Sequence, residues 1–271
     1  MKTFLCSIFT LLLMTLGHAQ ISSESQFSIG ETLEINSKIL QEERTLNIYL
    51  PHGYERDTEK TYPVIYLLDG SADEDFIHIA GIVQFCSFSW INILPESIVV
   101  GIANVDRKRD FTSPSEVEID QKELPTSGKS DKFIAFIAEE LQGIIDEKYR
   151  TTNTKTLIGQ SLGGLLATEI LFERPGLFDN YIIISPSLWW NDEKLLTYDL
   201  DKSLKDKSVY IGVGKEGAQM ERLAQSLFYK LTLEKKNDIQ LFFNHFEEQD
   251  HGDVLHLAVY DAFEKLFKKK E

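Results

Sequence analysis

The stretch LIGQSLGGLLATE, Leu157–Glu169, places three glycines around a single serine, between an apolar run and a segment with helical character. Glycine weakens the interior of a strand or a helix, so its use here needs a backbone reason. Residues 159–163 fit the spacing G-x-S-x-G, in which a serine stands on a tight strand-to-helix turn and small residues two positions away avoid clashes. The N–H groups that begin the helix would lie beside the hydroxyl, where an oxyanion forms. The stretch therefore predicts that Ser161 is a nucleophile, with an ordinary glycine-rich turn as the alternative.

Continuous apolar runs on both sides of this stretch predict strands that are buried on both faces of a sheet. The runs are YPVIYLLDG (62–70), ESIVVGIAN (96–104), KTLIGQ (155–160), NYIIISP (180–186), SVYIGVG (208–214) and IQLFFNHF (239–246). Two earlier segments, FSIGETLEINSKIL (27–40) and RTLNIYLP (44–51), alternate apolar and polar residues instead. Such alternation is typical of half-buried antiparallel strands, so these two segments predict an antiparallel N-terminal edge.

Segments with helical periodicity fall between the predicted strands. They are SDKFIAFIAEELQGIIDEKYR (130–150), the segment after Ser161, AQMERLAQSLFYKLTL (218–233) and VLHLAVYDAFEKLFKKK (254–270). Strands that alternate with helices form right-handed crossovers, so the pattern predicts an α/β fold with a mainly parallel, doubly wound sheet. With no repeat or low-complexity linker in the chain, we expect residues 20–271 to form one domain.

The first nineteen residues have the layout of a secretory signal peptide, with Lys2, the mainly apolar stretch Phe4–Leu16 and small residues before a cut after Ala19. We therefore expect an exported protein, periplasmic or secreted. A retained anchor is the alternative, but the apolar stretch is shorter than the roughly 20 residues of a membrane span. Cleavage leaves Cys86 as a lone cysteine, which its apolar flanks predict to be a buried thiol without a disulfide.

The net charge of the chain limits the classes of partner that it is expected to bind. The 271 residues carry a formal net charge of −15 without a basic block, which argues against nucleic acid and anionic membrane surfaces. The acidic run DGSADED (69–75) lacks the spacing of a calcium loop, and neither a phosphate-cradling motif nor a paired-cysteine metal site occurs. We expect a small-molecule substrate, no metal and no cofactor.

A serine nucleophile needs a histidine base, and three histidines follow Ser161 along the chain. His245 lies within a predicted strand and His256 on a predicted helix, so both fit structural or exposed positions. His251 lies in the loop between the last strand and the last helix, at the sheet edge where Ser161 stands. His251 is therefore the predicted base, with a solvated loop histidine as the alternative.

The acid that orients the base has three candidates. Glu216 follows the predicted strand 208–214, and a carboxylate there can reach an imidazole in the next strand's loop. Asp192 follows the preceding strand and is a rival. Asp250 is adjacent to His251, but a neighbouring side chain seldom turns back onto the ring. The argument from strand order favours Glu216.

Two backbone amides are predicted to hold the oxyanion. One is the amide of Leu162, directly after the nucleophile. The other is the amide of Ser71, because the loop after the strand 62–70 supplies the second donor in hydrolases of this kind. A simple Asp-Gly turn is the alternative interpretation of that loop.

Six motifs together resemble a known family. They are RTLNIYLPHGY (44–54), YPVIYLLDG, NVDRKRDFTSPS (104–115), GQSLGG (159–164), SPSLWWND (185–192) and DHGD (250–253). Their order is similar to that of the Putative esterase family, the esterase D-like branch of the α/β-hydrolases, which includes trilactone-siderophore esterases. The resemblance implies the α/β-hydrolase fold, a serine nucleophile at Ser161, a base at His251 and an acid at Glu216.

The same resemblance implies that Arg107 and Arg109 border the active-site cleft and that Trp190 walls it. Both arginines belong to the stretch 104–130, which has no clear periodicity and leaves the C-terminal end of a predicted strand, where open α/β sheets bind ligands. A salt bridge that braces this loop, and a buried aromatic, are the alternatives for these residues.

The expected activity is that of a serine hydrolase that cleaves carboxylic esters of soluble short-chain or aryl substrates through an acyl-enzyme. An acyltransferase, which passes the acyl group to an alcohol, is the alternative on the same fold. A non-catalytic binding module is the alternative from a different class. Nothing in the sequence indicates the long apolar lid of a lipase.

Overall fold

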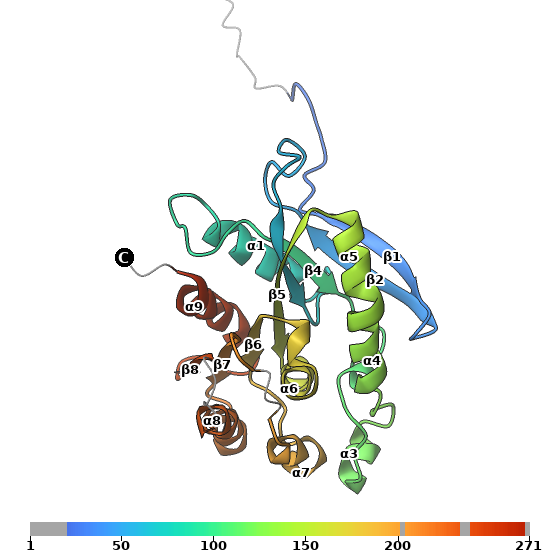
Figure 1. Ribbon diagram of the computed structural model, residues 1–271, viewed down its shortest axis with the longest axis vertical. Helices are drawn as coiled ribbons and strands as arrows, with labels where there is room; N and C mark the ends of the chain where they lie inside the picture. The colour runs from blue at the N-terminus through green and yellow to red at the C-terminus, as the bar shows by residue number, and fades with distance from the viewer. Residues whose placement is uncertain (1–20, 201–203, 234–238, 269–271) are drawn as a thin grey trace, which may run out of the picture.

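A computed structural model of the chain describes residues 21–200, 204–233 and 239–268 (Figure 1). The predicted signal peptide lies outside these residues. Within them the chain forms an eight-stranded sheet with the order β1-β2-β4-β3-β5-β6-β7-β8. The described part contains no helix that is both long and apolar enough to cross a membrane.

Six strands run parallel and the first two form the antiparallel edge, which confirms the predicted fold class. The strands are β1 (Glu31–Ser37), β2 (Glu42–Tyr49), β3 (Tyr62–Leu67), β4 (Ile98–Ile102), β5 (Thr151–Gln160), β6 (Asn180–Ile184), β7 (Ser208–Gly214) and β8 (Gln240–Phe246). The pairs β1–β2 and β2–β4 are antiparallel, and every pair from β4 to β8 is parallel. One expectation needs correction: β8 is an edge strand, and its residues are half-buried rather than buried on both faces.

Helices cover both faces of the sheet (Figure 1). The longer ones are α1 (Phe76–Cys86), α6 (Leu162–Glu173), α8 (Ala218–Leu233) and α9 (Val254–Phe267). The predicted helix 130–150 is divided into α4 (Ser130–Phe136), a π-helical turn (Ile137–Leu141) and α5 (Gln142–Lys148). Short helical segments are α2 (Arg107–Asp110), α3 (Glu118–Glu123) and α7 (Trp190–Glu193), with 3₁₀ turns at Pro175–Leu177 and Lys194–Thr197.

The core has two halves because successive side chains of a strand point to opposite faces. In β3, Ile65 and Leu67 pack with α1 and α9, whereas Val64 and Tyr66 pack with α4, α6 and α8. Cys86 is a buried free cysteine in the first half. Burial raises the pKa of its thiol to about 11, which keeps it uncharged at neutral pH.

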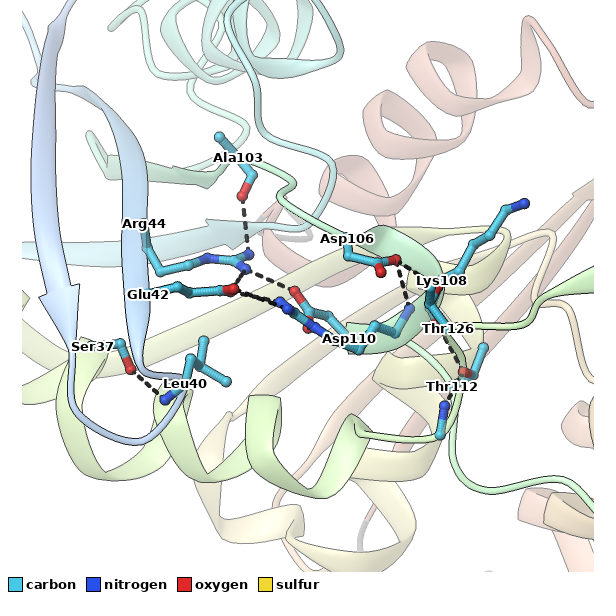
Figure 2. A network of polar contacts seen from close by, with 12 residues as sticks. Ser37, Leu40, Glu42, Arg44, Ala103, Asp106, Lys108, Asp110, Thr112 and Thr126 are labelled. Atoms are coloured by element: carbon cyan, nitrogen blue, oxygen red, sulfur yellow. Dashed lines mark hydrogen bonds and ion pairs between the residues drawn. The ribbon is translucent and has the colours of Figure 1, made fainter. Parts of the chain in front are cut away.

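A buried ion network joins the antiparallel edge to α2 (Figure 2). The side chain of Arg44, 1% exposed, donates from Nη1 to Asp110 Oδ2 at 2.7 Å and to Glu42 Oε1 at 2.8 Å. Its Nη2 donates to the carbonyl oxygen of Ala103 at 3.1 Å. Arg109 completes the network, with Nε 2.7 Å from Asp110 Oδ1 and Nη2 2.6 Å from Glu42 Oε1.

The two guanidinium groups of this network favour the charged form of Glu42. Burial raises the pKa of Glu42, but hydrogen bonds from Arg109 and Arg44 outweigh it and hold the pKa below its usual value. Hydrogen bonds with Asp110 and Glu42 raise the pKa of Arg109 in turn. Both shifts favour the charged forms of Glu42 and Arg109, and the network fixes α2 against β2.

The stretch 104–130 is ordered by further contacts within itself (Figure 2). Thr126 Oγ1 donates to Asp106 Oδ1 at 3.0 Å, and Thr112 Oγ1 donates to the carbonyl of Lys108 at 2.6 Å. The N–H of Gly128 donates to Thr112 Oγ1 at 3.0 Å. The predicted loop is thus a braced segment that contains two short helices.

Asp110→Ala is expected to destabilise the fold by about 3 kcal/mol, because it leaves a buried guanidinium without one of its carboxylates. Asp146→Ala is the matched control: the side chain of Asp146 is 38% exposed and pairs with Lys155 at the surface, so its loss costs less than about 1 kcal/mol. Urea unfolding of both variants measures the difference. Equal losses would contradict the role assigned to the network.

Candidate active site

Ser161 stands between β5 and α6 with a strained backbone, at φ 59° and ψ −119°. This left-handed φ is uncommon for a residue other than glycine. A Cβ on Gly159 would lie 2.4 Å from the carbonyl oxygen of Gly163, so the turn closes only with glycine at position 159. A Cβ on Gly164 would lie 2.8 Å from the carbonyl oxygen of Ile184, which shows how closely α6 packs on β6.

His251 and Glu216 are in contact across the carboxyl edge of the sheet. His251 Nδ1 lies 2.5 Å from Glu216 Oε2. The side chain of Glu216 is 3% exposed, whereas that of His251 is 48% exposed. The other carboxylate oxygen, Oε1, accepts from the N–H of Gly214 at 2.9 Å and from the hydroxyl of Ser185. Every oxygen of the carboxylate therefore has a donor.

The loop that carries His251 is fixed by two hydrogen bonds. Gln160 Nε2 donates to the carbonyl of His251 at 2.6 Å, which ties the histidine to the residue before Ser161. The N–H of Lys215 donates to the carbonyl of Gln249 at 2.7 Å, which ties the loop to the residue before Glu216.

The two rival acids make no described hydrogen bond with the imidazole of His251. Asp250 Oδ1 accepts from the N–H of Gly252 at 2.8 Å, within its own loop. Asp192 lies in a left-handed turn, at φ 52°, and makes no described hydrogen bond or ion pair with His251. Of the three candidates, Glu216 is the one in contact with the imidazole.

The contact between His251 and Glu216 shifts both groups toward their charged forms. Burial raises the pKa of Glu216, but hydrogen bonds from His251, Ser185 and Gly214 outweigh it and lower the pKa below its usual value. The hydrogen bond with Glu216 raises the pKa of His251, against the opposing effect of burial. A buried carboxylate that stabilises an imidazolium is what a general base needs when it takes a proton.

A cavity of about 670 Å³ opens onto these residues. Its lining consists of Ser161, Ser187, Trp189, Lys215, Glu216, Met220, Asp250 and His251. Ser161 Oγ lies 3.3 Å from Ser187 Oγ, and this is the one hydrogen bond that the described residues offer the nucleophile's hydroxyl. The site therefore brings together the predicted nucleophile, base and acid at a single opening.

The predicted oxyanion donors follow β5 and β3. The N–H of Leu162 is at the first position of α6, where a helix leaves its donors without intrahelical partners. The N–H of Gly70 donates to the carbonyl of Ile102 at 3.0 Å, whereas that of Ser71 has no acceptor among the described residues. The end of β3 lies close to the turn between β5 and α6, since a Cβ on Gly163 would lie 3.3 Å from an oxygen of Asp69.

Arg107 lies next to the turn that carries Ser161, and its guanidinium group makes a bidentate contact with one carboxylate. Its Nε and Nη2 donate to the two oxygens of Asp69 at 2.6 and 2.9 Å, and Nη2 also reaches the carbonyl of Gln160 at 3.3 Å. Burial lowers the pKa of Arg107, but hydrogen bonding to Asp69 outweighs it and raises the pKa. Its Nη1 has no partner among the described residues.

None of the three predicted substrate-binding residues is among the described residues that line the cavity, and two of them have structural contacts elsewhere. Arg109 points into the network with Glu42 and Asp110, which matches the bracing salt bridge that was its alternative. Trp190 is 2% exposed and its Nε1 donates to the carbonyl of Ser113 at 2.9 Å, so it anchors the stretch 104–130. The tryptophan that lines the cavity is its neighbour, Trp189.

Sequence reasoning missed Ser187, Trp189, Lys215 and Met220, which also line the cavity. Ser187 and Trp189 lie in the motif SPSLWWND that carries part of the family resemblance. Lys215 precedes the predicted acid directly. Their position directly after a parallel strand could therefore have marked these residues as candidates. The sequence does not show in which direction each side chain points.

The sequence pattern of the family described as Putative esterase matches residues 37–254. The chain belongs to this esterase family. It is 29% identical to the ferri-bacillibactin esterase BesA of Bacillus subtilis over 241 residues, which cover 80% of this chain and 83% of BesA. The structure of an IroE-like serine hydrolase from Shewanella oneidensis matches with a TM-score of 0.79 and 28% identity, covering 88% of this chain and 80% of that one. The BES protein from Bacillus cereus matches with a TM-score of 0.81 and 26% identity, covering 93% and 100%. These comparisons confirm the family and the hydrolase fold.

Glu216→Gln is expected to lower the maximal kcat/KM on an ester and to move its acid limb to lower pH. The carboxylate raises the pKa of His251, and a neutral amide does not, so the imidazole would stay unprotonated at lower pH. A profile of kcat/KM from about pH 5 to 9 measures both effects. Asp192→Asn is the control and should leave the limb in place; the reverse pattern would assign the acid to Asp192.

Proposed function

We propose that this esterase hydrolyses carboxylic esters through a triad of Ser161, His251 and Glu216. The observation that carries the proposal is the contact of 2.5 Å between His251 and a buried Glu216, at the cavity that Ser161 lines. His251 takes the proton of Ser161 as Oγ attacks the ester carbonyl carbon, and the alcohol leaves with that proton. Water, activated by His251, then releases the acid from the acyl-enzyme.

The oxyanion of each tetrahedral intermediate is assigned to the amides of Leu162 and Ser71. Both donors belong to the backbone, so they need no side-chain ordering when the charge develops. The assignment is supported by the N–H of Ser71, which has no acceptor among the described residues, and by the close approach of β3 to the turn at Ser161.

For the substrate we propose soluble short-chain or aryl esters, including acidic or phenolic ones. The cavity offers the face of Trp189 for a ring, together with the ammonium group of Lys215. Arg107 lies nearby with a free Nη1, suited to a charge-assisted hydrogen bond with an anionic oxygen. The similarity to the ferri-bacillibactin esterase BesA supports siderophore esters as natural candidates.

Ser161→Ala is expected to abolish fluorophosphonate labelling and to lower kcat on a nitrophenyl ester by about 10⁴ or more, with the fold retained. Ser71→Ala is the matched control, because it removes a hydroxyl and keeps the backbone N–H; its kcat should stay within a few-fold of the wild type. Labelling followed by intact mass checks both variants. Near-normal turnover by folded Ser161→Ala would end the proposal.

Long-chain esters are expected to be poor substrates, since the described lining of the cavity offers only two apolar side chains, Trp189 and Met220, to a chain of twelve carbons. A chain-length series of nitrophenyl esters, run beside a feruloyl ester and a catecholate trilactone, measures the preference through kcat/KM. Arg107→Gln should lower kcat/KM for the acidic or phenolic esters more than for nitrophenyl acetate. The highest kcat/KM on twelve-carbon or longer chains would contradict the proposed substrate class.

A further inference from the structure

A second serine, Ser187, faces Ser161 from the turn that follows β6. Ser187 is 2% exposed, lines the cavity, and its Oγ lies 3.3 Å from Ser161 Oγ. The hydroxyl of Ser187 makes no other hydrogen bond within the described residues. Ser161 Oγ is therefore the single described partner that satisfies this nearly buried hydroxyl.

The backbone fixes the two serines relative to each other before their side chains meet. The N–H of Ser187 donates to the carbonyl of Ser161 at 3.0 Å, and the N–H of Ser161 donates to the carbonyl of Ile184 at 3.0 Å. The N–H of Trp190 donates in turn to the carbonyl of Ser187 at 3.2 Å. The Cα positions of both serines are thus set by main-chain bonds, so the pairing of the hydroxyls follows from the fold.

The turn after β6 supplies one hydroxyl to each end of the triad. Ser185, in a left-handed conformation at φ 44°, directs its Oγ to Glu216 Oε1. Pro186 packs under the start of α6, where a Cβ on Gly164 would lie 3.0 Å from its Cα. Ser187 then directs its Oγ to Ser161. The first serine serves the acid and the second faces the nucleophile.

We propose that Ser187 is a catalytic residue that donates a hydrogen bond to Ser161 Oγ in both halves of the reaction; this rests on the proposed role of Ser161 as nucleophile. During acylation Ser161 gives its proton to His251 while Oγ forms a bond to the carbonyl carbon. A donor on Oγ stabilises the negative charge that develops on that atom and leaves the proton of Ser161 free for His251.

In the acyl-enzyme Ser161 Oγ is an ester oxygen and carries no proton, so it can only accept. During deacylation the bond between the carbonyl carbon and Oγ breaks, the electron pair returns to Oγ, and His251 returns the proton. Ser187 donates to Oγ as this charge appears and keeps its own proton throughout. The opposite direction, with Ser161 donating to Ser187, would withhold the nucleophile's proton from His251 and would slow the enzyme.

Ser187→Ala tests the direction, and Ser187→Cys tests it with a side chain of similar size that donates weakly. Stopped-flow bursts of nitrophenyl acetate on the full chain separate acylation from deacylation. We expect Ser187→Ala to slow both steps roughly tenfold, as the loss of one hydrogen bond implies, and Ser187→Cys to fall between it and the wild type. The acid limb of kcat/KM should stay in place, because Ser187 makes no described hydrogen bond with Glu216 or His251. Ser185→Ala is the matched control and should move that limb through Glu216.

Unchanged or faster acylation and deacylation in Ser187→Ala would overturn the proposal. If Ser187→Ala loses its cooperative thermal unfolding, Ser187→Cys decides: slower steps at a wild-type Tm support the proposal, and wild-type rates overturn it. A wild-type chain without a burst, together with an active Ser161→Ala, would refute the nucleophile itself and the proposal with it. A normal burst in the wild-type chain that Ser187→Ala leaves unchanged is a different result, and it would overturn only the role of Ser187.

Discussion

The left-handed backbone of Ser161 is the constraint on which the site depends. A non-glycine residue in such a conformation costs about 1–3 kcal/mol, so its surroundings must over-determine it. Here the strain is opposed by main-chain hydrogen bonds on both sides: the N–H of Ser161 binds β6, and its carbonyl accepts from Ser187 and from Leu165 at 3.0 and 2.9 Å. Gly159 removes the clash that a side chain would create beneath the turn.

The parallel sheet then determines where the other reacting groups can stand. Ser161, Glu216 and His251 each follow a different strand, and the carboxyl ends of neighbouring parallel strands meet at one edge. Glu216, the proposed acid, is 3% exposed, and hydrogen bonds from three donors favour its charged form. The proposed base, His251, remains half-exposed, where an imidazole could meet both a substrate and water.

This dependence on strand order explains how much could be predicted from the sequence. The strands were visible as apolar runs, and the order nucleophile, acid, base placed Ser161, Glu216 and His251 at the same edge without any knowledge of side-chain direction. The positions of Arg109 and Trp190 could not be predicted in this way, because they depend on the direction in which each side chain points. Arg107 and Arg109 are two residues apart, but one turns to Asp69 and the other to Glu42, because the short helix α2 has partners on two sides. Trp189 and Trp190 likewise diverge at a tight turn, and nothing in a WW pair says which ring is buried.

The ion network around Arg44 has a consequence for how the antiparallel edge pairs. Burial of Leu46 and Ile48 already opposes a slip in the register of β2 against β4. Glu42 and Arg44 are two residues apart on β2 and therefore face the same side, toward Asp110. A slip of one residue would turn Glu43 and Thr45 toward that carboxylate and expose the guanidinium. The polar cluster thus favours the same alignment of β2 as its buried apolar side chains, and a slipped strand would lose the bonds of Arg44 to Asp110 and to the carbonyl of Ala103.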